Sequence, residues 1–205
     1  MVTIYVQKVG DVWFGVACDG ERIFATGFGP SEKRVLQSLW ECVPSNVPFQ
    51  RVEKASAFAQ RVIGLLKDVY DGKDASENFP FETRRLSDYT RRVIEAVCLI
   101  PPGYVASYGG VARATGGSPR AVGRVMALNP FAPLCPCHRV VASDFTLCGY
   151  GGGLDVKLAF LKRERKGYSS KKQIEVDKHK LELFPVEFVL DRAEKGKRQF
   201  SLDSL

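Results

Sequence analysis

Apolar and polar residues alternate along the first part of the chain, which is the pattern of strands that bury one face. Val2 and Ile4 begin this alternation, and the dipeptides Gly-Asp at 10–11 and Asp-Gly at 19–20 interrupt it. Such dipeptides favour the tight turns that join antiparallel strands. The pattern therefore predicts a three-stranded meander over residues 2–27.

The apolar spacing then changes to that of helices. Ser31 is a good N-cap, and Val35 and Leu39 follow it four residues apart on one face. A second amphipathic helix is predicted over residues 55–70. The polar, proline-containing stretch that follows, residues 71–86, is typical of a boundary between domains.

Three more helices are predicted over residues 87–99, 108–114 and 118–128. The last of them begins with Ser118 as N-cap and Pro119 at the first helical position. Two short helices joined by a glycine-containing turn are typical of a helix-turn-helix. The small residues of the third helix fit two interpretations: close approach to a grooved partner such as DNA, or close packing inside the protein.

The rest of the chain contains one more predicted helix and a tail. The helix covers residues 154–166, and the tail becomes apolar again at residues 181–190, which we expect to pack on the same protein. The organisation predicted is an N-terminal domain, a domain with the helix-turn-helix, and a C-terminal extension of unknown role, over residues 1–80, 81–167 and 168–205.

Composition restricts the class of protein but does not decide its function. The 205 residues are 45% hydrophobic and 26% charged, as in globular proteins, and no apolar run approaches the roughly 20 residues that span a bilayer. Thirty Lys and Arg against 23 Asp and Glu give a net charge of +7, which permits a polyanionic partner without requiring one. Six cysteines without a Cys-x-x-Cys pair favour a reducing compartment, hence a cytoplasmic, nucleoid-associated or nuclear protein.

The segment that carries chemistry is residues 136–141, Pro-Cys-His-Arg-Val-Val. It places a thiol, Cys137, beside an imidazole, His138. A cysteine nucleophile needs a base or a positive charge nearby, and the two side chains converge only if the backbone turns, with a water able to bridge them. A carboxylate best orients such a histidine, and Glu164 on the last predicted helix is the candidate.

Three other interpretations of this segment stay open on spacing alone. Cys135, Cys137 and His138 have donor atoms for zinc, although three donors within four residues do not match usual zinc spacing. Cys137 also fits an inert core thiol, the commonest role of a buried cysteine. A Cys–His hydrolase is the third alternative, although we find no signature of an oxyanion hole.

The motif and its neighbours resemble the O6-alkylguanine-DNA alkyltransferase family. Pro-Cys-His-Arg-Val-Val at 136–141 is preceded by Arg-Ala-Val-Gly at 120–123 and Asn-Pro at 129–130, and is followed by Gly-Gly-Leu at 152–154. The resemblance is strong over residues 87–166. It implies an α+β protein in which a small RNase H-like α/β domain precedes a winged helix-turn-helix-like alkyltransferase domain.

The resemblance also implies the catalytic residues. Cys137 corresponds to the cysteine that accepts the alkyl group, and His138 to the general base, which works through a bound water. Glu164 corresponds to the acid that orients this histidine, and Asn129 to the residue that ties the recognition helix to the active-site turn.

Two further sets of residues follow from the same resemblance. The pocket for the flipped base corresponds to Tyr108, Met126, Val140, Tyr150, Gly151 and Gly152. The DNA-binding surface corresponds to Ser118, Arg120, Ala121, Gly123 and Arg124, with Arg120 entering the duplex in place of the flipped nucleotide. In this chain Ser118-Pro119 directly precedes Arg120, where many members have a longer turn.

The function implied is DNA repair by single-turnover transfer of an alkyl group from O6-alkylguanine in duplex DNA to Cys137. The expected partner is double-stranded DNA that carries the lesion, and the protein is expected to bind it as a monomer. We expect no association with a membrane, no metal and no other cofactor. The alternative from the same resemblance is an alkyltransferase-like protein that binds lesions without chemistry. Members of that group lack the cysteine, so Cys137 argues against it.

Overall fold

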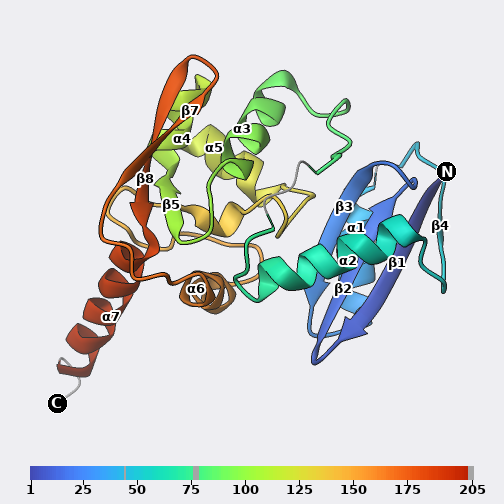
Figure 1. The fold of residues 1–205 in the computed structure, drawn as a ribbon, viewed down its shortest axis with the longest axis horizontal. Helices are drawn as coiled ribbons and strands as arrows, with labels where there is room; N and C mark the ends of the chain where they lie inside the picture. The colour runs from blue at the N-terminus through green and yellow to red at the C-terminus, as the bar shows by residue number, and fades with distance from the viewer. Residues whose placement is uncertain (44, 76–78, 203–205) are drawn as a thin grey trace. The chain divides into compact units, whose positions relative to one another are not determined.

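The chain forms two compact units in the computed structural model, which describes residues 1–43, 45–75 and 79–202 (Figure 1). One unit comprises Met1–Ser87 with Asn129–Cys135, and the other comprises Asp88–Leu128 with Pro136–Leu205. Part of the predicted domain boundary, residues 76–78, and the end of the predicted extension, residues 203–205, lie outside the described residues. The predicted α+β class is confirmed, because both units combine helices with a sheet.

The sheet of the first unit contains the predicted meander. The strands β1, β2 and β3 are antiparallel neighbours, and a short fourth strand, β4, pairs in parallel with β1, which gives the order β3-β2-β1-β4. The alternating pattern of the sequence predicted the three long strands, whereas β4 has no such pattern. The four strands are Val2–Val9, Val12–Cys18, Ile23–Gly29 and Phe49–Arg51.

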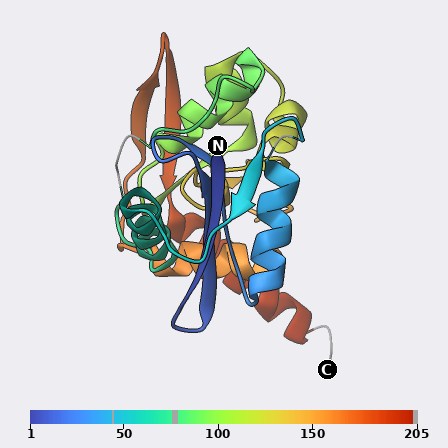
Figure 2. The same ribbon diagram turned by 90° about the vertical axis from the view of Figure 1, so that its right-hand side faces the viewer.

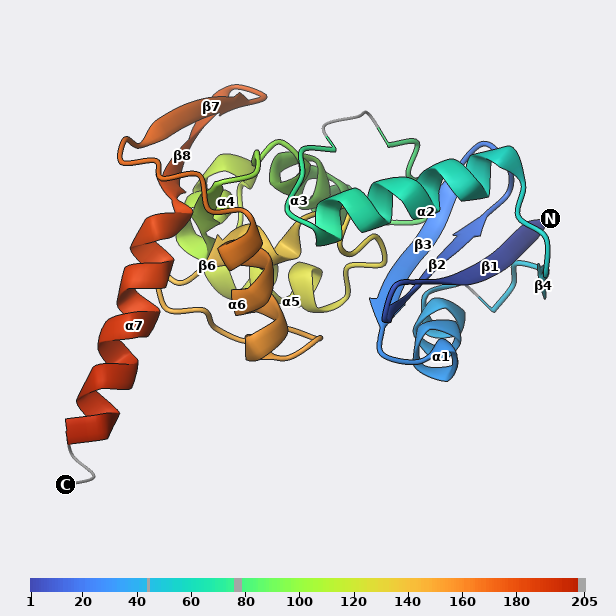
Figure 3. The same ribbon diagram turned by 60° about the horizontal axis from the view of Figure 1, so that its bottom comes forward.

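Two helices cover the opposite faces of this sheet, α1 (Glu32–Cys42) and α2 (Ala57–Tyr70) (Figures 2 and 3). The side chain of Ser31 caps α1, as the sequence predicted. Successive residues of β2 contact the two helices. A Cβ atom at Gly15 would lie 2.7 Å from side-chain atoms of α1, whereas the ring of Phe14 meets that of Tyr70 on α2 at 5.6 Å. The small residue at Gly15 thus lets α1 lie close to the sheet.

The predicted boundary is partly bound to the first unit. The Ile23 N–H donates to the Pro80 carbonyl, and the Glu82 N–H donates to the Ile23 carbonyl. The buried Glu82 carboxylate accepts from Arg84 and Arg22, at 2.5 and 3.1 Å, and Arg84 above all lowers its pKa to about 2. Residues 80–82 therefore extend the β3 edge of the sheet.

The second unit contains two short helices joined by a tight turn, at the place where the sequence predicted a helix-turn-helix. Its first three helices are α3 (Asp88–Cys98), α4 (Tyr108–Thr115) and α5 (Pro119–Ala127). Gly116 ends α4 with φ at +72°, a conformation that glycine adopts without a steric cost. A Cβ atom at Gly117 would lie 2.3 Å from the Tyr89 hydroxyl of α3. The tight turn between α4 and α5 thus depends on both glycines.

The C-terminal extension is part of this second unit. The hairpin strand β8 pairs with β5, so the sheet has the order β6-β5-β8-β7, and β8 lies alongside α4 (Figure 1). The apolar run at 181–190 is the end of β8 and the start of α7, and it packs on the same protein as predicted. The remaining elements are β5 (Tyr104–Ser107), β6 (Val140–Val141), β7 (Lys172–Val176), β8 (His179–Pro185), α6 (Leu154–Arg163) and α7 (Val186–Leu202).

Among the described residues, no helix combines the length and the apolar composition that are needed to cross a membrane.

The close contact at the helix-turn-helix makes a stability prediction. Gly117→Ala is expected to lower the free energy of unfolding by about 1–3 kcal/mol, because the new methyl group would overlap the ring of Tyr89. Gly123→Ala in the middle of α5 is the matched control, because among the described residues its added Cβ atom would meet no heavy atom within 4 Å beyond its chain neighbours and the nearby backbone of its own helix. It is expected to be neutral or to add up to about 1 kcal/mol. Urea unfolding measures both, and equal effects would contradict the role of Gly117.

Candidate active site

The thiol and the imidazole of the motif lie on a tight turn. Residues Cys137–Arg139 form one turn of 3-10 helix, in which the Arg139 N–H donates to the Pro136 carbonyl at 2.9 Å. The chain then enters β6, which pairs in parallel with β5. The backbone thus turns at Cys137 and His138, as convergence of their side chains requires. Both residues are buried, with Cys137 5% exposed and His138 fully buried.

His138 is paired with the carboxylate that the sequence analysis selected. Its Nε2 lies 2.8 Å from Oε1 of Glu164, which follows the last turn of α6, and both side chains are fully buried. The imidazole stacks on the ring of Phe160 at 4.5 Å. Its Nδ1 is buried and has no hydrogen-bond partner among the residues that the structure describes. Burial lowers the pKa of His138, which favours the neutral imidazole, a base, at pH 7.

Arg139 completes this buried cluster. Its Nη1 donates to the Ile100 carbonyl. Its Nε and Nη2 also donate to Glu164, at 2.8–3.1 Å. Burial by itself would raise the pKa of Glu164, but His138 and Arg139 outweigh it and lower that pKa to about 2. Glu164 is therefore ionised at pH 7 and holds His138 in one orientation.

Lys157 is a site residue that the sequence analysis missed. It is fully buried on α6, and its ammonium group donates to the carbonyls of Val140 and Leu147, at 2.7 and 2.5 Å. It also lies 5.8 Å from the centre of the Tyr108 ring. Burial lowers its pKa to about 8, whereas the nearby Cys137 raises it. A signal was present, because position 157 falls on the apolar face of α6 three residues after Leu154.

The predicted base-pocket residues all belong to the second unit. Tyr108 is half-buried, and burial together with the neighbouring thiols raises its pKa to about 12, so its hydroxyl remains a donor. Burial raises the pKa of Tyr150, and Cys137, to which its hydroxyl is hydrogen-bonded, raises it further. Met126 and Val140 are buried apolar residues. Gly151 and Gly152 are exposed in the loop before α6.

Asn129, the fourth predicted catalytic residue, belongs to the first unit. Its amide nitrogen donates to the Cys135 carbonyl at 3.0 Å, and its amide oxygen accepts from the Phe131 N–H at 3.0 Å. In the chain it comes two residues after α5, and Cys135 comes two residues before Cys137. Asn129 thus stabilises the segment 129–135, which connects α5 to Cys137 in the chain.

The predicted DNA-binding residues lie along one side of α5. Ser118 caps the helix by accepting from the Ala121 N–H at 3.2 Å. Arg120 and Arg124 are exposed, one helical turn apart, while Ala121 and Gly123 are half-buried. The opposite side of α5 is buried in the unit through Val122, Val125 and Met126. The helix therefore presents two cations and small residues to solvent.

The described residues contain no group of three or more His, Cys, Asp or Glu side chains arranged to hold a metal ion. All six cysteines are free thiols. Cys148 is exposed beside the glycine-containing loop, and Cys135 is buried in the first unit.

Fold and site together define an α+β protein in which two short helices joined by a tight turn precede a buried thiol, imidazole and carboxylate. Residues 88–166 match the family model described as the DNA binding domain of 6-O-methylguanine DNA methyltransferase. The resemblance noted in the sequence is confirmed over this stretch.

Curated relatives with the name methylated-DNA–protein-cysteine methyltransferase support this assignment. The protein of Mycobacterium leprae is 40% identical over 112 residues, which are 53% of this chain and 66% of the relative. That of Methanothermobacter thermautotrophicus is 42% identical over 78 residues, 38% of this chain and 44% of the relative. That of Pyrobaculum aerophilum is 54% identical over 65 residues, 32% of this chain and 44% of the relative. The chain thus spans only about half the length of such relatives.

Solved structures extend the likeness to most of the fold. The O6-methylguanine-DNA methyltransferase of Pyrococcus kodakaraensis aligns with a TM-score of 0.61 and 26% identity, over 80% of this chain and 99% of that one. The Mycobacterium tuberculosis OGT in complex with DNA aligns with a TM-score of 0.64 and 26% identity, over 80% of this chain and 93% of that one.

The buried carboxylate makes a prediction about acid stability. The pKa of Glu164 falls from 4.5 to about 2 on folding, so its ionised form adds stability above pH 4.5. That stability, on the order of 3 kcal/mol, is lost as the pH falls from 4.5 towards 2. Glu164→Gln is therefore expected to lose less stability between pH 7 and pH 3 than the wild type, by urea unfolding. Glu95→Gln on the exposed side of α3 is the control; a Glu164→Gln protein as acid-sensitive as this control would contradict the prediction.

Proposed function

We propose that this protein repairs DNA by transferring an alkyl group from O6-alkylguanine in duplex DNA to Cys137. The observation that carries the proposal is the buried series Cys137, His138 and Glu164 in the same unit as the exposed helix α5. The family match and the names of the relatives support the same reaction.

The reaction proposed is a displacement at the alkyl carbon. His138, neutral at pH 7, accepts the thiol proton of Cys137 through a water at Nδ1, and Glu164 stabilises the imidazolium that results. The thiolate forms a bond to the alkyl carbon while the carbon–O6 bond breaks, and the departing guanine takes up a proton. The positive charge of Lys157 near Cys137 favours the thiolate. No second nucleophile cleaves the thioether, so each molecule reacts once.

The base must leave the duplex before it can react, because O6 of guanine is enclosed in the stacked helix. In this proposal α5 binds the minor groove, where small residues and an inserted side chain suit binding with little sequence readout. Arg120 fills the space of the flipped nucleotide, Arg124 contacts phosphate, and Ser118, Ala121 and Gly123 allow close approach. The flipped base lies among Tyr108, Met126, Val140, Tyr150, Gly151 and Gly152.

The proposal also includes a fold type for each of the two units. The order β3-β2-β1-β4 with helices on both faces fits an RNase H-like first unit. The succession α3, β5, α4, α5 fits a winged helix-turn-helix in the second. We propose that the protein acts as a monomer on double-stranded DNA.

Transfer to the protein itself is the test of the function. Duplex DNA that carries O6-methylguanine is mixed with the protein under reducing conditions, and the digest is mapped by mass spectrometry. We expect one methyl group per molecule on the peptide that holds Cys137, and none with Cys137→Ser. Tight binding of lesion DNA that stays methylated would instead favour the lesion-binding alternative, and repeated turnover of an ester would favour a hydrolase.

Arg120 separates base flipping from chemistry. Arg120→Ala is expected to slow methyl transfer from duplex DNA at least tenfold, because nothing then replaces the flipped nucleotide. Reaction with the free base O6-benzylguanine is expected to change less than about twofold, since a free base needs no flipping. Rates of Cys137 labelling with the two substrates measure this. An equal loss with both would show that Arg120 does not act in flipping.

A further inference from the structure

The C-terminal extension lies outside the family match, yet it completes the core beneath the active site. Val186, Val189 and Leu190 of α7 are buried in one cluster with Val141 of β6 and Leu161 of α6. These two partners lie close in the chain to site residues, since Val141 follows Val140 and Leu161 is three residues before Glu164. The extension therefore packs on the elements that carry the reactive groups.

The extension also holds the segment that leads to the base pocket. We call residues 142–153, between β6 and α6, the base-pocket loop. Its Phe145 adopts φ of +65°, and its ring contacts the rings of Phe184 and Phe188, both of the extension, at 5.1 and 5.3 Å. The N–H of Phe145 donates to the Ala142 carbonyl, so the turn is closed as well as packed. Because non-glycine residues rarely adopt this conformation, outside contacts must hold it.

Polar contacts reinforce this arrangement. Hydrogen bonds from Thr146 lower the pKa of Asp144 in the base-pocket loop, and the positive charge of Arg192 on α7 lowers it further. Two residues after Phe145, the Leu147 carbonyl accepts from the buried Lys157. Tyr150, whose hydroxyl is hydrogen-bonded to Cys137, comes three residues later. A short stretch of chain thus connects the aromatic contact to the nucleophile.

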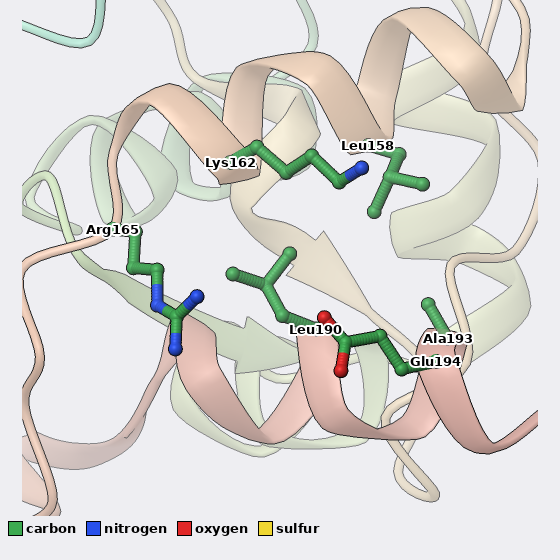
Figure 4. A pocket seen from close by; sticks show the side chains of 6 residues that line it. All are labelled: Leu158, Lys162, Arg165, Leu190, Ala193 and Glu194. Carbon is green, nitrogen blue, oxygen red and sulfur yellow. The ribbon is translucent and has the colours of Figure 1, made fainter.

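The helix that carries Glu164 has the same neighbour. α6 and α7 lie side by side, with a hollow between them (Figure 4). From the α6 side it is lined by Leu158, Lys162 and Arg165, and from α7 by Leu190, Ala193 and Glu194.

We propose that the extension is a positioning element for the base-pocket loop, and that Phe188 is one of the two aromatic residues through which it acts. It holds Phe145 in its left-handed conformation and thereby fixes Tyr150, Gly151 and Gly152 relative to Cys137. Preorganisation of this kind raises the rate of the chemical step without changing the affinity for the duplex, which α5 determines. This inference rests on the proposed function for its kinetic consequence only.

The experiment compares Phe188→Ala with two matched variants. Phe188→Tyr keeps the ring and tests rescue. Val176→Ala removes a buried side chain from β7, at the opposite edge of the sheet from β6 and the base-pocket loop, and controls for loss of stability in the extension. Single-turnover methyl transfer is measured over a range of duplex concentrations, which gives a maximal rate constant and a half-saturating concentration. Thermal unfolding shows that each variant is folded at the assay temperature.

Phe188→Ala is expected to lower the maximal rate constant about tenfold at an unchanged half-saturating concentration. Phe188→Tyr is expected to restore the rate to within about twofold, and Val176→Ala to leave it unchanged. If Phe188→Ala slows transfer no more than Val176→Ala, or if only the half-saturating concentration changes, the positioning role is wrong.

Amide hydrogen exchange separates this inference from the proposed function. Phe188→Ala is expected to speed exchange in residues 142–153 and not in α5, whether or not the wild type transfers a methyl group. A wild type that transfers nothing would overturn the proposed function alone. Unchanged exchange in the base-pocket loop would overturn the positioning role alone.

Discussion

The ionised carboxylate of Glu164 is the group on which the second unit depends. A buried charge is costly unless it is paired and hydrogen-bonded, and here His138 and Arg139 supply both. Arg139 in turn donates to the Ile100 carbonyl, just after α3. One carboxylate thus joins α6, the 3-10 turn and, through Arg139, the end of α3. The hydrogen bonds that orient His138 are therefore part of the same network that packs these three elements together.

Much of the fold was predictable because its signals are local. The meander, the serine caps and the helix-turn-helix each depend on residues that are close together in the chain. The β4 pairing and the bonds of Ile23 to residues 80–82 were not predicted, because they join distant segments without any pattern of their own. The extension was expected to pack on the protein, but its pairing with β5 could not be derived from apolar spacing alone.

The same distinction applies to the site. Cys137 and His138 were found from their motif, and Glu164 from the need for a carboxylate. Lys157 was missed because a lysine in a helix is normally interpreted as a solvated residue. The net charge of +7 gave no help, since Arg139 and Lys157 are buried close to the thiol while Arg120 and Arg124 are exposed on α5. The chemical role of a cation depends on its position, and the net charge does not show which Lys and Arg side chains are buried at the site and which are exposed.

The segment Asn129–Cys135 has a consequence for how the chain reaches its folded state. It lies between α5 and Cys137 in the chain, yet it packs within the first unit. There Thr26 donates to the carbonyls of Pro130 and Ala132, and Phe131 stacks on Phe81 at 4.2 Å. The Thr26 contacts close loops of about a hundred residues and the Phe81 contact one of about fifty, so their formation carries a large entropic cost and is slow. A protein synthesised from its N-terminus must therefore keep its first unit incomplete until residue 135 has emerged. The two units are products of one interleaved folding process, and a cut at residue 87 would leave Phe131 without the surface that buries it.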